Sequence, residues 1–183
     1  MRRCTMPKQF VAVILTLLST TLHATPWETV AADRFKLLWK ELTYTQLQVD
    51  PRQEAPANND ILSPAYSKQI IIEYALSVSA ERFRDLTQEQ LEDTYDAAQL
   101  APHRDDIARF NSWYLGVEKG DRYQLRWQTD VGLQLQHNDT VLGTLQDPEA
   151  AKLILSVWLG PAAVSESQRD RFLDAWQQEL AAR

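Results

Sequence analysis

Residues 143–161 read GTLQDPEAAKLILSVWLGP, and this stretch predicts a buried helix that is entered from a strand end or turn. Asp147 offers a capping oxygen, Pro148 suits the first helical position and Glu149 lies near the positive end of the helix dipole. Apolar side chains then cover most of the helix circumference, which is typical of a helix buried on nearly all sides. Gly160 stands where a left-handed C-terminal cap is expected.

Short alternating stretches precede this helix. Apolar and polar residues alternate from Tyr123 to Trp127 and again from Leu133 to His137, and a further strand covers Val141 to Leu145. Turns are predicted at 129–132 and 138–139. Because such short connections suit hairpins and parallel pairing needs a longer crossover, we expect antiparallel strands here.

The first half of the chain begins with strands. After a lead-in segment, residues 25–33, one extended stretch is expected from Arg34 to Val49, followed by a proline-bearing loop to Pro64. The clearest strand covers 68–78, with alternate residues on one face: Ile70, Ile72, Tyr74, Leu76 and Val78.

Helical patterns come next. Ser79 precedes a first helical turn, residues 80–85, and residues 87–90 match a capping box. A helix is expected over 105–115, and residues 165–168 form a second capping box. That box opens an exposed amphipathic terminal helix, whose apolar face is Phe172, Leu173, Trp176 and Leu180. This order of elements favours an α+β class rather than a βαβ alternation.

The N-terminus resembles an export signal. A basic region with Arg2, Arg3 and Lys8 precedes the apolar residues 10–18, and Ala24 offers a cleavage point. The apolar run is shorter than the ~20 residues of a spanning helix, so we expect no stable membrane anchor after processing. We predict a signal peptide at 1–24, a single domain at 25–183 and a periplasmic location. An uncleaved anchor is the alternative.

Composition excludes several classes of function. Removal of the three basic residues of the signal takes the formal charge from −6 to −9, which gives no electrostatic footprint for nucleic acid. Phosphate-cradling loops and dinucleotide fingerprints are missing, so no cofactor is expected. With Cys4 in the signal, His103 and His137 are poor candidates for a metal site, because structural zinc needs four close ligands. We predict no metal site.

The stretch 143–161, together with Gly120-Asp121 and the strands between, resembles the C-terminal half of chalcone isomerase-like proteins, specifically their bacterial secreted branch. The resemblance extends over roughly Arg34 to Leu173. It implies an antiparallel β-sheet covered on one face by a helical layer, an open-faced sandwich.

The resemblance also allows a test for catalysis. Plant chalcone isomerases close a chalcone with an arginine, a threonine, a tyrosine, and a lysine and asparagine on a helix. Placing Tyr44 on the family's strand-ending tyrosine puts Trp39 at the threonine position, and Arg34 is the nearest candidate for the arginine. The family's helix carries the lysine, but residues 87–94 at this place in the sequence have acidic side chains instead. No catalytic residue is therefore carried over, and we lean against an enzyme.

The leading hypothesis is an exported, non-catalytic domain that binds a small apolar or amphipathic molecule, such as a fatty acid. In this fold, a cleft between the sheet and the helices can hold such a ligand. Candidates to line the cleft are Arg34, Trp39, Tyr44, Trp113 and Tyr114, although aromatic residues at this spacing also fill ordinary cores.

Two alternatives stay open. One is an intramolecular lyase or isomerase acting on a chalcone-like enone. The other is an envelope accessory protein that contacts an unknown protein partner through its acidic surface or through the helix bearing Phe172 and Trp176.

Overall fold

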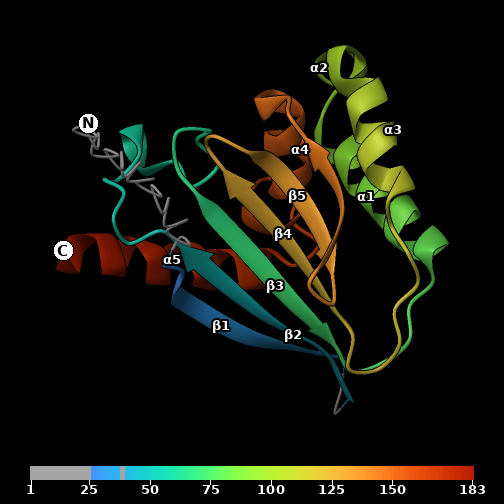
Figure 1. Cartoon of the computed structure of the whole chain (residues 1–183), viewed down its shortest axis with the longest axis horizontal. Helices are drawn as coiled ribbons and strands as arrows, with labels where there is room; N and C mark the ends of the chain where they lie inside the picture. The colour runs from blue at the N-terminus through green and yellow to red at the C-terminus, as the bar shows by residue number, and fades with distance from the viewer. Residues whose placement is uncertain (1–25, 38–39) are drawn as a thin grey trace, which may run out of the picture.

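The computed structural model describes residues 26–37 and 40–183. The predicted signal peptide and Trp39 lie outside the described residues. The described chain forms one six-stranded sheet with a layer of helices on one side (Figure 1).

All neighbouring strands of the sheet are antiparallel, and their spatial order follows the sequence. The strands are β1 (Glu28–Leu37), β2 (Lys40–Val49), β3 (Lys68–Tyr74), β4 (Arg122–Gln128), β5 (Gly132–His137) and β6 (Thr140–Leu145). The hairpins predicted after residue 122 are confirmed. Asn138 and Asp139 both take positive φ, 46° and 71°, as a two-residue hairpin turn requires.

The single extended stretch expected from Arg34 to Val49 is wrong, as is the lead-in at 25–33. Residues 28–49 form a hairpin instead, with Arg34 opposite Tyr44 and Leu37 opposite Lys40. Apolar and polar residues alternate on both sides of the reversal, and the sequence between the two strands has no Gly, Pro, Asn or Asp to mark it. Continuous alternation therefore hid the turn.

The helices are α1 (Ala80–Thr94), α2 (Ala97–Leu100), α3 (Arg104–Ser112), α4 (Pro148–Leu159) and α5 (Glu166–Ala182), with 3₁₀ turns at Ala57–Asn59 and Ala101–His103. The predicted caps Asp147 and Ser165 each accept a backbone N–H of the first turn, and so does Ser79 before α1. The capping box at 87–90 is wrong, because Thr87 lies inside α1. Its hydroxyl donates to the Phe83 carbonyl at 2.9 Å, a bond that needs no helix end.

Gly160 ends α4 as predicted, but its backbone is extended (φ −133°) rather than left-handed. Glycine is needed there for close packing. A Cβ on Gly160 would lie 2.7 Å from the Cβ of Ser156 and 2.8 Å from a methyl group of Leu62.

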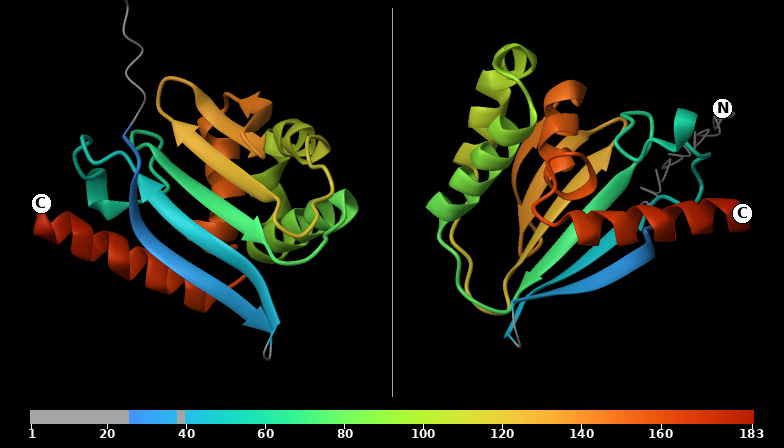
Figure 2. Two further views of the ribbon diagram at one scale, coloured as in Figure 1. Left: turned by 60° about the horizontal axis from the view of Figure 1, so that its bottom comes forward. Right: turned by 180° about the vertical axis from the view of Figure 1, so that it is seen from behind.

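The long helices all lie on one side of the sheet, and the described chain leaves the other side uncovered (Figure 2). The core lies between these layers, where alternate strand residues meet the helices. α5 lies against the β1 side, where Arg171 and Gln168 bind the Asp33 carboxylate at 2.5 and 3.1 Å.

The expectation that α5 is an exposed helix with a free apolar face is wrong. Phe172 is 1% exposed and Trp176 is fully buried, with its indole N–H donating to the Tyr66 hydroxyl at 3.3 Å. An apolar helix face is stable only when covered, and here the loop before β3 and the sheet cover it. The accessory hypothesis therefore loses this helix face as a contact surface.

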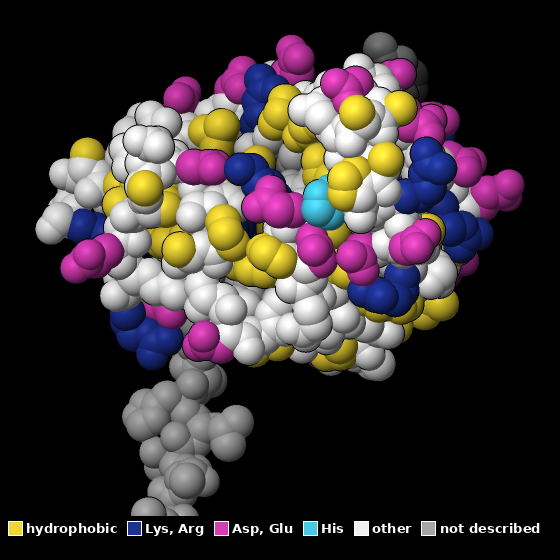
Figure 3. All heavy atoms as spheres, turned by 90° about the horizontal axis from the view of Figure 1, so that it is seen from above, with side chains coloured by type: hydrophobic (Ala, Val, Ile, Leu, Met, Phe, Trp, Pro, Cys, Tyr) yellow, Lys and Arg dark blue, Asp and Glu magenta, His cyan; other side chains and the backbone are white. Residues whose placement is uncertain are grey.

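The surface carries charges of both signs. On the face shown in Figure 3, basic side chains are interspersed with acidic ones rather than gathered in one patch. Among the described residues, no helix has the length and apolar character to cross a membrane.

Candidate functional site

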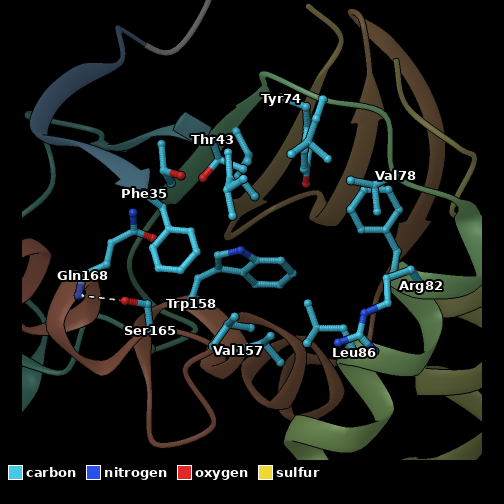
Figure 4. Close-up of a pocket in the computed structure, with 16 residues that line it drawn as sticks. Phe35, Thr43, Tyr74, Val78, Arg82, Leu86, Val157, Trp158, Ser165 and Gln168 are labelled. Atoms are coloured by element: carbon cyan, nitrogen blue, oxygen red, sulfur yellow. Dashed lines mark hydrogen bonds between the residues drawn. The ribbon is translucent and has the colours of Figure 1, made fainter. Parts of the chain in front are cut away.

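A cavity of about 220 Å³ lies between the helix-facing side of β1–β3 and the helical layer (Figure 4). We call it the sheet–helix cavity. The strands and the segment after β3 contribute half of its lining: Phe35, Leu42, Thr43, Thr45, Ile72, Tyr74, Leu76 and Val78. The helical side contributes the other half: Arg82, Phe83, Leu86, Val157, Trp158, Val164, Ser165 and Gln168.

Strand alternation explains the sheet side of the cavity. Thr43 pairs with both Phe35 of β1 and Tyr74 of β3, so these three side chains share one face. Thr45 and Ile72 form the next pair along the same face. Since the period of a strand is two, the residues between them face away from the cavity.

Helix α1, the end of α4 and the start of α5 form the helical wall. The Val164 N–H donates to the Val157 carbonyl at 3.0 Å, which fixes the link beside the last turn of α4. Trp158 is half-buried, and its indole extends from α4 into the cavity (Figure 4). Gln168 donates from its side-chain nitrogen to the Asp33 carboxylate.

Tyr74 contributes a phenolic hydroxyl to the lining, on a side chain that is largely buried. Its ring meets Phe83 and Tyr123 edge-on, with centroids 5.4 and 6.2 Å apart, and its hydroxyl is directed into the cavity (Figure 4). Burial raises the pKa of Tyr74 well above its usual value, and the nearby tyrosines Tyr114 and Tyr123 raise it further. The hydroxyl therefore stays protonated at neutral pH.

Arg82 gives the cavity a positive charge. Among the described lining residues it is the one charged side chain, and it lies at the rim of the cavity with 54% of its side chain exposed. Its guanidinium reaches Glu89 at 3.2 Å, an exposed pair that contributes little to stability. An incoming anion could take the place of Glu89.

Arg34 and Tyr44 lie together, but on the outer face of the sheet. The Arg34 guanidinium is 4.8 Å from the centre of the Tyr44 ring and 2.6 Å from Glu41. They border a separate outer hollow of about 250 Å³, which Glu73 also lines. The structure therefore does not bring this pair to the sheet–helix cavity.

Trp113 and Tyr114 lie on the helical side without lining the cavity. Trp113 packs on β6, with its ring against Gly143. Tyr114 is 4% exposed and stacks on Phe83 at 5.4 Å, so it supports a cavity residue from behind. Trp39, the fifth candidate, lies outside the described residues.

Sequence reasoning missed Thr43, Tyr74, Arg82 and Trp158. A signal for Tyr74 was present, because Ile70, Ile72 and Tyr74 were already expected on one face. The hairpin of β1 and β2 was not recognised, so nothing showed which face of β2 joins Tyr74. A shift of one residue moves a side chain to the opposite face, which separates Tyr44 from Thr43.

The lining is mostly apolar and has few ionisable groups. Among its described residues there is no carboxylate, histidine, lysine or thiol to act as a general base. In the part of the chain that the structure describes, no group of three or more His, Cys, Asp or Glu residues could hold a metal ion. His103 and His137 instead lie 3.4 and 3.5 Å from single carboxylates, those of Asp147 and Asp121.

Comparison with known proteins identifies the family. A sequence model described as chalcone isomerase-like matches residues 51–174, well over half of the chain, and the chain therefore belongs to the chalcone isomerase-like family. A search of curated proteins finds no significant match.

Among solved structures, a fatty-acid binding protein of Arabidopsis thaliana is similar, with a TM-score of 0.64 and 12% identity. The similarity covers 88% of this chain and 93% of that chain. At such low identity it shows the fold alone, and the predicted α+β open-faced sandwich is confirmed.

Proposed function

We propose that this member of the chalcone isomerase-like family binds, without transforming it, a small amphipathic molecule with an acyl chain, such as a fatty acid. The observation that carries the proposal is an apolar cavity with a single guanidinium, that of Arg82, at its rim. An acyl chain gains about 25 cal/mol for each Å² removed from water, and its carboxylate would bind Arg82.

The size and lining of the cavity support a short ligand. Its volume of about 220 Å³ is below the ~300 Å³ at which typical ligand sites begin, so we propose a medium-chain acid. The similar Arabidopsis structure, which is named for fatty-acid binding, supports the same ligand class. The isomerase alternative has less support, because the lysine and the asparagine of the plant enzymes have no counterpart among the described residues of the lining.

Calorimetric titration with decanoate and with decanol tests this proposal. Both should bind the wild-type protein. Arg82→Gln should lower the affinity for decanoate by about 3- to 10-fold more than the affinity for decanol, because a charge-assisted bond to an exposed guanidinium is lost. Arg84→Gln is the matched control, since Arg84 lies on the same helix and does not line the cavity. Equal losses in the two variants, or no binding to the wild type, would contradict the proposal.

We also propose that the protein is exported to the periplasm and belongs to the bacterial secreted branch of the family. The basic and apolar N-terminal pattern, with Ala24 at the cleavage point, supports this. Intact-mass spectrometry of protein from its producing cells should give a chain that starts at Thr25. A chain that retains residues 1–24 would contradict export with cleavage.

A further inference from the structure

We propose that the sheet–helix cavity selects acyl chains that carry a neutral oxygen part-way along the chain, as a hydroxyl or oxo group. The oxygen would be bound by the hydroxyl of Tyr74 and the indole N–H of Trp158. This inference rests on the proposed function and names the ligand class more narrowly.

Tyr74 provides the first observation. The residue is 8% exposed, and its hydroxyl is directed into the cavity (Figure 4). The hydroxyl forms no hydrogen bond with any residue that the structure describes. The two neighbouring tyrosines are different. The Tyr123 hydroxyl accepts from the Leu115 N–H at 2.7 Å and donates to the Leu115 carbonyl at 2.8 Å. Tyr114 does not line the cavity.

Trp158 provides a second, independent observation. Its indole enters the same cavity from the opposite wall (Figure 4), and its N–H likewise has no acceptor within the described part of the chain. Tryptophan and tyrosine side chains usually find a partner for this polar atom once it is buried, as a bound ligand would bury it here. Thr43, which pairs with Tyr74 across the strands, adds a hydroxyl to the same face.

The cost of leaving these donors unmet sets the preference. An unsubstituted acyl chain in the cavity would cover both donors, and a donor that is covered without a partner costs about 1–3 kcal/mol. A carbonyl or hydroxyl oxygen has two lone pairs and can accept from both. A carboxylate is a poor occupant of this interior position, because burying an unpaired charge costs far more than burying a neutral oxygen. The charged end of the ligand therefore stays at Arg82.

The test compares dodecanoic acid with its positional oxo and hydroxy derivatives by calorimetric titration. At least one derivative should bind the wild type about 10-fold more tightly than dodecanoic acid, equivalent to about 1.4 kcal/mol. In Tyr74→Phe this ratio should fall below about 3-fold. Tyr114→Phe is the matched control, because it removes a buried hydroxyl outside the cavity, and it should keep the full ratio.

Each outcome is decisive. Binding of dodecanoic acid with no preference for any derivative would overturn this inference and leave the proposed function standing. A preference that persists in Tyr74→Phe would also overturn it. Failure of every acid to bind the wild type would overturn the proposed function and the inference together. If Tyr74→Phe does not fold, Trp158→Phe removes the other donor and should lower the same ratio.

Discussion

At the scale of single residues, Lys68 at the start of β3 is the least expected feature. It is 1% exposed, its Nζ donates to the Ser63 carbonyl at 2.7 Å, and it lies 5.6 Å from the centre of the Trp127 ring. Burial lowers the pKa of Lys68 to about 7, with Asp60 raising it and Lys152 lowering it further. Lys68 therefore destabilises the folded state at neutral pH.

The pH dependence of Lys68 follows from this depressed pKa. Between pH 7 and 10.5 the unfolded chain holds a proton that the folded chain lacks, so stability rises with pH across this window. Below pH 7 the destabilisation is complete. Lys68→Met should therefore raise the free energy of unfolding at pH 7 by about 2–3 kcal/mol, after the loss of the bond to Ser63.

Urea titrations of both proteins at pH 6, 7, 8 and 9.5 measure this effect. The advantage of Lys68→Met over the wild type should shrink as the pH rises. An advantage that stays constant with pH, or a destabilised variant at every pH, would show that burial does not lower the pKa of Lys68.

At the scale of elements, the contact between the end of α3 and β6 depends on one glycine. A Cβ on Gly143 would overlap the Trp113 ring, which packs flat on the strand at this point. Gly143 pairs with Leu135 of β5, so the contact joins the helical layer to the β6 edge of the sheet.

Replacement of this glycine should cost stability. Gly143→Ala should lower the free energy of unfolding by about 1–3 kcal/mol, because an aromatic ring held between two elements has little room to move. Gly116→Ala is the control, since its added Cβ would meet only ordinary contacts, the nearest at 3.5 Å from the Val78 carbonyl oxygen. Thermal unfolding should give a lower melting temperature for the first variant alone. Equal melting temperatures would mean that Trp113 can leave β6 without cost.

At the scale of the whole molecule, the sequence predicts the fold class and the second half of the sheet, but neither the first hairpin nor the site. Helix α4 and the hairpins β4–β6 were predictable, because a capping aspartate, Pro148 and turn residues such as Asn138-Asp139 act locally. The β1–β2 hairpin was not predictable, since no local breaker marks its reversal. α5 was assigned to the surface because its amphipathic pattern does not say what covers Phe172 and Trp176.

The site depended on that missed hairpin. Tyr44 and Thr43 are neighbours in sequence and lie on opposite faces of the sheet, and only the pairing with Tyr74 decides which of them faces the helices. Arg82 and Trp158 come from different helices, α1 and α4, so no spacing in the sequence connects them. A ligand cavity is a property of the packed layers, and the same residue types would also make a filled core.

A crystal structure of the protein grown with dodecanoic acid would test the central claim most directly. We predict one acyl chain in the sheet–helix cavity, in contact with Phe35, Leu86 and Trp158, with its carboxylate at Arg82. An acid bound instead in the outer hollow beside Arg34 and Tyr44 would contradict this account. So would a cavity closed by its own side chains, with no acid bound between the sheet and the helices.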